Sequence, residues 1–160
     1  MTIAYNNFTT ESWDQFYDII KNYVTDPKTG RTSKWIWGAF PDQQYWDGEG
    51  DLPLIIINKP NINIENMTVG VSTNDKIRFN GTIVISIICG DGDNAGLDSL
   101  SDSIMTAFNT HTSDLITAGL RELRFVNSNA YHLEIPKTDT GFQARNLTYN
   151  FFATTGRGST

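Results

Sequence analysis

The stretch TIVISIICGDGDNAGLDSLSDSIMTAF, residues 82–108, contains the clearest strand and the clearest helix of this chain. Residues 82–89 are apolar on both alternating faces, which is typical of a central strand that is covered on at least one side. Residues 97–108 have apolar side chains at helical spacing, with Asp98 and Asp102 in the first turns, where carboxylates favour a helix N-terminus. The loop GDGDNAG lies between them, and its glycines and aspartates raise the question of a ligand site.

The residues of this loop argue against ligand binding. A dinucleotide fingerprint needs its third glycine one residue before Gly96, and Asp91 and Asp93 would repel a pyrophosphate. A P-loop needs a lysine before Ser or Thr, which the loop does not have. A calcium loop counted from Asp91 would place Ala95 at a ligand position and Asp102 where a bidentate glutamate is usual. We therefore interpret the loop as a polar joint, and the sequence predicts no metal or cofactor.

Helical and strand patterns alternate on both sides of this joint. The expected helices are 12–24, with Ser12 and Gln15 at capping-box spacing, and 113–118, which ends at Gly119. The expected strands are 35–40, 52–58, 121–128 and 141–154, with a hairpin over 59–81, a mobile polar loop over 26–34 and a long loop over 42–51.

The order of these elements predicts an α+β fold. The expected sheet is mixed and mostly antiparallel, with about four to six strands, and the N-terminal helix and two further helices pack on it. Residues 1–154 are expected to form one domain, followed by a disordered tail over 155–160.

The charge pattern argues against tight DNA binding. The net charge is −6, and no lysine or arginine lies between Arg78 and Arg121, whereas several aspartates do. A surface that binds nucleic acid needs clustered cations. No apolar run is long enough to span a membrane, and the N-terminus does not resemble a secretory signal.

Catalytic patterns are also missing from the sequence. The single cysteine, Cys89, ends a buried strand and is interpreted as a core residue. His111 and His132 are the only histidines, and neither has a partner at zinc-ligand spacing. No triad or carboxylate pair suggests an enzyme, so we expect this chain not to be one.

Aromatic residues gather between the first two expected strands. Trp35, Trp37, Tyr45 and Trp46 lie close together in the sequence. They either cover the core on one side of the sheet or face outward as interface anchors, positions in which Trp and Tyr are enriched. The sequence leaves both interpretations open.

The chain resembles the tail-terminator and tail-completion proteins of long-tailed phages and related viruses. The resemblance lies in LPLIIIN (52–58), in the acidic helix pattern of Leu97, Asp98, Leu100, Asp102 and Ile104, and in a final strand with Arg145, Tyr149 and Phe151. It covers roughly residues 53–154, and its motifs are diffuse hydrophobic patterns.

The resemblance implies a ring, usually a hexamer, at the head-proximal end of the tail tube. Such a ring ends tube polymerisation, contacts the tube protein on one face and a head-completion or neck protein on the other, and lets DNA pass without specific binding. The chain would then be a virion protein assembled in the host cytoplasm, with no membrane contact. We expect Asp91, Asp93, Asp98 and Asp102 to face the channel. We expect Arg121, Arg145 and the four aromatic residues Trp35, Trp37, Tyr45 and Trp46 to contribute to interfaces.

Two alternatives remain open at this stage. The first is another structural part of the same kind of particle, such as a head–tail connector, a minor capsid protein or a tail-tube subunit. The second is a ligand-binding or metal-binding module that uses residues 91–102.

Overall fold

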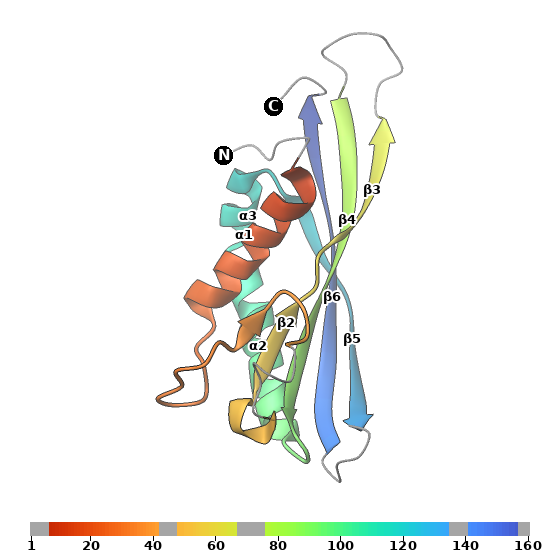
Figure 1. Ribbon diagram of the computed structural model, residues 1–160. Helices are drawn as coiled ribbons and strands as arrows, with labels where there is room; N and C mark the ends of the chain where they lie inside the picture. The colour runs from red at the N-terminus through yellow and green to blue at the C-terminus, as the bar shows by residue number, and fades with distance from the viewer. Residues whose placement is uncertain (1–6, 42–47, 67–75, 135–140, 157–160) are drawn as a thin grey trace.

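A computed structural model describes residues 7–41, 48–66, 76–134 and 141–156 (Figure 1). The elements in chain order are α1 (Phe8–Tyr23), β1 (Ile36–Trp37), the short 3₁₀ helix η3 (Gly48–Asp51), β2 (Leu54–Ile57), β3 (Asn61–Asn66), β4 (Lys76–Gly90), α2 (Asn94–Thr110), α3 (Thr112–Ala118), β5 (Arg121–Glu134) and β6 (Gly141–Gly156). The six-stranded sheet has the order β1-β2-β4-β6-β5, and β3 pairs with β4 next to β2. Only β1 and β2 run parallel. The expected α+β class and mixed sheet are confirmed.

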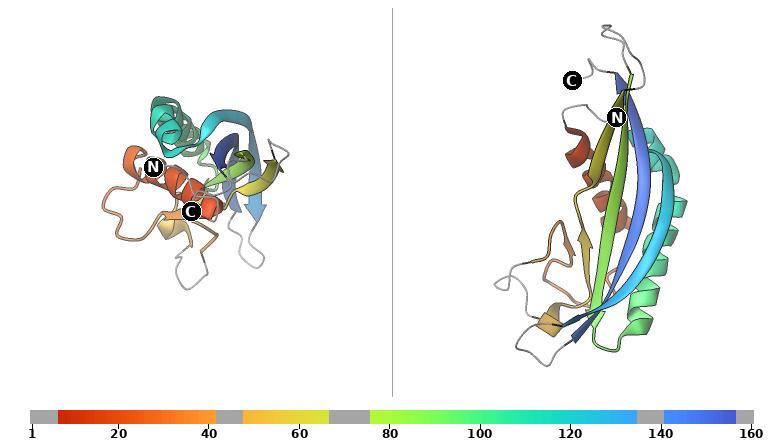
Figure 2. Two further views of the ribbon diagram at one scale, coloured as in Figure 1. Left: turned by 90° about the horizontal axis from the view of Figure 1, so that it is seen from above. Right: turned by 90° about the vertical axis from the view of Figure 1, so that its right-hand side faces the viewer.

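The helices cover one side of the sheet. Figure 2 shows α1, α2 and α3 on the same side of the long strands. The helix-facing isoleucines of β4 (Ile83, Ile85 and Ile87) are fully buried there, as their alternation predicts. Aromatic rings from the helices complete this main core, for example Phe16 and Phe108, which meet edge to face at 5.6 Å between centroids.

The N-terminal helix begins earlier than expected. It starts at Phe8, whose ring stacks on Phe79 of β4 at 4.3 Å between centroids. Ser12 therefore lies inside the helix, where its Oγ donates a hydrogen bond to the Phe8 carbonyl at 2.6 Å. The capping-box interpretation of Ser12 was wrong, because the apolar stripe of the helix extends one turn further back to Phe8.

The central strand is longer than its apolar core suggests. Residues 76–81, assigned to a hairpin from the sequence, belong to β4 and pair with β6 from Lys76↔Gly156 onward. The expected hairpin is formed by β3 and the start of β4, which pair antiparallel from Asn61↔Thr82 to Asn66↔Ile77, and residues 67–75 between them lie outside the described residues. Gly81 pairs directly with Phe151, whose ring fills the space over the glycine.

The joint between β4 and α2 is structural. Asp93 caps α2, because its side chain accepts a hydrogen bond from the Gly96 backbone N–H at 2.9 Å. The helix begins at Asn94, so Asp98 and Asp102 lie beyond its first turn. Gly119 ends α3 with φ of 101°, as expected for a C-terminal glycine.

Three strand boundaries differ from the expectation. β1 covers only Ile36–Trp37, β5 continues to Glu134, and β6 continues to Gly156. Thr155 and Gly156 are therefore strand residues and not part of a disordered tail, whereas residues 157–160 lie outside the described residues. Long-range pairing lengthens β5 and β6, since each holds the other in register.

The substitution Gly81→Ala should destabilise the fold. A methyl group at this position would collide with the Phe151 ring, so we expect a loss of about 1–3 kcal/mol in the free energy of unfolding. The control is Gly90→Ala, where no atom lies within 4 Å of the added carbon. Urea unfolding midpoints measure both effects, and equal midpoints would contradict this account of β4.

Candidate functional site

The side of the sheet opposite the helices forms a broad polar surface, here called the open face. The strand registers place half-buried or exposed side chains of four strands on it. They are Asn61, Asn63 and Glu65 of β3; Arg78, Asn80, Thr82 and Val84 of β4; Asn146, Thr148, Asn150, Phe152 and Thr154 of β6; and Arg121, Arg124, Asn127, Asn129 and Tyr131 of β5. At the other end of the same side, Ser86, Ile88, Phe142 and Ala144 are buried and lie outside the open face.

Hydrogen bonds between strands fix many of these polar side chains. Thr82 Oγ1 donates to Asn150 Oδ1 at 2.8 Å. Asn146 Oδ1 accepts from Ser86 Oγ at 2.7 Å and from the Tyr131 hydroxyl at 3.2 Å. The open face is therefore an ordered wall of amides and hydroxyls and lacks the apolar centre of a typical protein interface.

The charge of the open face differs from that of the whole chain. Among the residues that the registers assign to it, Glu65 is the only carboxylate, whereas Arg78, Arg121 and Arg124 are cations at one end. Arg78 donates to Asn80 Oδ1 at 2.8 Å and lies 4.1 Å above the centre of the Phe152 ring. The charge of these described positions is therefore opposite in sign to the net charge of −6 of the whole chain.

The four acids expected in a channel lie at one end and on the covered side of the sheet. Asp91 and Asp93 belong to the turn after β4, and Asp91 lies 3.9 Å from His132 of β5. Asp98 and Asp102 are exposed on α2, on the opposite side of the sheet from the open face. The structure therefore does not bring these four carboxylates together with the open face.

The aromatic residues expected at an interface contribute to packing. Trp35 and Trp37 are partly buried against a second apolar cluster at one end of the sheet. That cluster consists of Leu52, Leu54, Ile56, Ile88, Phe142 and Ala144. Tyr45 and Trp46 lie outside the described residues. Trp35 and Trp37 therefore cover apolar core residues, which is one of the two roles left open by the sequence.

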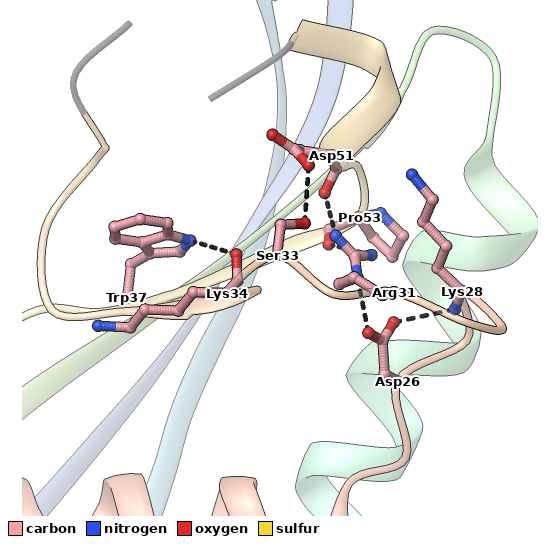
Figure 3. Close-up of polar contacts among 8 residues, drawn as sticks. All are labelled: Asp26, Lys28, Arg31, Ser33, Lys34, Trp37, Asp51 and Pro53. Carbon is pink, nitrogen blue, oxygen red and sulfur yellow. Dashed lines mark hydrogen bonds and ion pairs between the residues drawn. The ribbon is translucent and has the colours of Figure 1, made fainter. Parts of the chain in front are cut away.

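A buried arginine holds the loop that the sequence analysis expected to be mobile. Figure 3 shows the Arg31 guanidinium between Asp26 and the carbonyl groups of Asp51 and Pro53. The ion pair with Asp26 measures 2.6 Å, and the Arg31 side chain is only 2% exposed. The expectation of a mobile loop over 26–34 was wrong at its centre, because Arg31 binds acceptors far along the chain.

The two arginines expected at an interface have different surroundings. Arg145 of β6 lies on the covered side, where it makes a 2.5 Å ion pair with Asp98 of α2 and donates to Ser101 Oγ at 3.4 Å. Arg121 is exposed at the start of β5. Arg145 therefore ties a helix to the sheet, and Arg121 remains available at the surface.

Exposed apolar side chains lie along both faces of β5 and on the preceding helix, a feature that the sequence analysis missed. Phe125, Val126 and Tyr131 of β5 are 43%, 47% and 36% exposed, and Ile116 of the preceding α3 is 44% exposed. Beneath Phe125 lies Tyr149, whose buried hydroxyl has no hydrogen-bond partner. The run of apolar residues in 121–134 is too irregular to reveal this from the sequence, because bulges at Arg121/Arg124 and Phe125/Asn127 shift its faces.

The histidines take part in local contacts and not in a metal site. His111 stacks on Tyr23 with 3.4 Å between ring centroids, and its Nδ1 lies 2.9 Å from Asp114 Oδ2. His111 and Tyr23 border a surface hollow of about 640 Å³ between α1 and α2. Within the described ranges, no three His, Cys, Asp or Glu side chains gather closely enough to hold a metal ion.

Cys89 is a core thiol. It is fully buried beside the joint, and burial, with a smaller effect of Asp93, raises its pKa to about 12, although Arg145 acts in the opposite direction. The thiol is therefore protonated at neutral pH and is a poor nucleophile.

Comparison with known proteins adds no family to this description. The chain matches no family model and no curated protein. None of the helices in the described part of the chain combines the length and the apolar character needed to cross a membrane.

The substitution Arg31→Ala should loosen the loops shown in Figure 3. It leaves a carboxylate and two carbonyls without their shared donor, so we expect the free energy of unfolding to fall by about 1–3 kcal/mol. Hydrogen exchange should also quicken over residues 48–53. The control Lys28→Ala removes an exposed cation of the same loop and should change the stability little. Equal losses in the two variants would contradict the role assigned to Arg31.

The Cys89 thiol should resist alkylation until the protein unfolds. Its folded-state pKa is raised above the value of about 8.5 in an unfolded chain, so the protonated thiol favours the folded state below that pH. This contribution is lost as the pH rises from there toward 12. Iodoacetamide labelling followed by mass spectrometry should be slow at pH 8 and fast in urea. Rapid labelling of the folded protein would contradict the burial of Cys89.

Proposed function

We propose that this chain is a virion structural protein that forms a ring at the head-proximal end of a viral tail tube. The ring ends tube growth, joins the tail to the head or neck proteins and lets DNA pass through its centre. The observation that carries the proposal is the open face. The family resemblance described above supports it, because that family supplies the position in the particle and the usual sixfold ring.

The open face has the chemistry of a wall along which DNA moves. Carboxylates would repel the phosphates, and a dense row of cations would retain them. The centre of the open face contains neither a carboxylate nor a row of cations, but the uncharged side chains of Asn80, Thr82 and Asn150. These side chains belong to a hydrogen-bonded polar surface, and only one of the positions assigned to that surface is a carboxylate. The three arginines at one end of the face provide a mild attraction for an entering polyanion.

This assignment competes with the expectation that the four acids line the channel. In a ring whose wall is the open face, Asp91 and Asp93 lie toward one rim. Asp98 and Asp102 then point away from the DNA, on the side that carries α2. The rims, and not the wall, are left to contact the tube protein and the neck protein.

The assembly state tests the proposal directly. Native mass spectrometry and negative-stain electron microscopy of the full chain should show closed rings with a central hole and a constant subunit number. Tubes that lengthen with protein concentration would identify a tube subunit instead. A protein that remains monomeric at every concentration and when mixed with tail tubes would overturn the proposal.

Charge changes test which surface lines the channel. The triple variant Asn80→Asp, Asn146→Asp and Asn150→Asp keeps the accepting oxygens of three open-face amides and adds three carboxylates. We expect rings and particles to assemble normally, with DNA ejection slowed at least tenfold in the virus that encodes the chain. The control Asn109→Asp adds an exposed carboxylate on α2 and should have no effect. Normal ejection by the triple variant would contradict the assignment.

A further inference from the structure

Strand β5 leaves a long backbone edge without a partner in the described structure. It contains 14 residues and stands at the end of the strand order, where it pairs only with β6. Residues 125–131, FVNSNAY, carry no charge, whereas charged residues lie at both ends of the strand. Natural edge strands usually carry charges or prolines that prevent further pairing, so an uncharged centre favours addition of another strand.

The apolar side chains around β5 support the same conclusion. Phe125, Val126 and Tyr131 are large and exposed, and the Phe125 ring meets the Tyr149 ring at 5.4 Å between centroids. A strand laid along β5 would cover part of this surface as well as the edge. Buried aromatic and aliphatic anchors of this kind stabilise protein interfaces.

Strand β3 provides a matching edge on the opposite side of the same sheet. It contains six residues, Asn61–Asn66, pairs only with β4 among the described strands and exposes 57% of Ile64. Across β3, β4, β6 and β5 every neighbouring pair is antiparallel. The β5 strand of one copy would therefore run antiparallel to the β3 strand of the next copy around a ring, and the alternation would continue without a break.

The two edges are offset along the sheet. Through the registers, Asn61 is level with Thr82, Asn150 and Arg124, near the start of β5. The middle of β5 lies instead level with β2, since Ile85 of β4 pairs with both Ile57 and Leu147, and Leu147 pairs with Ser128. The centre of β5 is thus displaced from that of β3 by about six residues.

This offset is of the size that ring closure requires. Strands in a closed barrel tilt by about 35–45°, which demands a fixed stagger between successive strands. About six residues of stagger over four strands corresponds to a tilt of about 45°, with a rise of about 3.3 Å per residue and a strand spacing of about 4.8 Å. With this shift Ile57 of the next copy is level with Glu134, the last residue of β5, and the rest of β2 and all of β1 lie beyond the paired residues.

We propose that residues 126–131 of one copy pair with residues 61–66 of the next, which closes the sheets of all copies into one continuous barrel lined by the open face. The shift places Asn129 opposite Asn63, both on the open face. On the helix side Ile64 then lies opposite Ser128, beside Val126. This inference rests on the proposed ring, and it specifies which surface of a second copy each edge binds.

Cysteine cross-linking tests the register of the contact. The double variant Asn63→Cys, Asn129→Cys should give, under oxidation, a ladder of covalent oligomers that ends at the ring number. Both positions are exposed, and the native Cys89 is buried. Neither single variant should form a ladder. Covalent dimers of the Asn129→Cys variant would show β5 pairing with another β5 and would overturn the proposal.

A charge introduced on the edge of β5 tests the β5–β3 contact separately from the formation of a ring. The variant Val126→Lys should weaken subunit association at least tenfold, because a lysine on an edge blocks strand addition. The control Thr117→Lys places the same charge on the exposed surface of α3, and both variants should keep the urea midpoint of the natural chain. Rings that survive Val126→Lys and give no ladder would overturn the β5–β3 contact while leaving the proposed function intact. If neither the natural chain nor any variant forms rings, and the double cysteine variant gives no ladder, both the proposed function and the β5–β3 contact are contradicted.

Discussion

The fold depends on the pairing of β4 with β6 over the full length of β4. All 15 residues of β4 have a partner, from Lys76↔Gly156 to Gly90↔Phe142. The side chains of both strands that face the helices enter the main core with α1 and α2. Because the helices supply enough apolar surface on one side, the other side can remain polar outside the second apolar cluster at its end. This division of faces produces the core and the open face together.

Local patterns in the sequence predicted the centre of this arrangement well. The alternation of isoleucines from Ile83 to Ile87 identified the middle of β4, and the apolar spacing from Leu97 to Phe108 identified α2. Gly119 marked the end of α3 for a purely conformational reason, since it adopts a positive φ. The loop between β4 and α2 was also interpreted as a joint, and Asp93 of this loop caps α2.

Features that depend on distant partners could not be predicted in the same way. Gly81 is read as a turn residue unless Phe151 is known to lie over it. Arg31 is a loop cation until the chain folds back and brings the carbonyl groups of residues 51 and 53 to it. The open face also requires the register, because only pairing sets Thr82 beside Asn150. The sequence contains the alternating polar residues but not the offset between strands.

The position of β6 in the sheet determines when the nascent chain can complete its strand pairing. β6 lies between β4 and β5, but the ribosome makes it after both of them. Until it emerges from the exit tunnel, the two earlier strands have no common neighbour, and non-local pairing of this kind forms slowly. Copies released before β6 is complete would therefore lack a finished sheet and would be open to degradation.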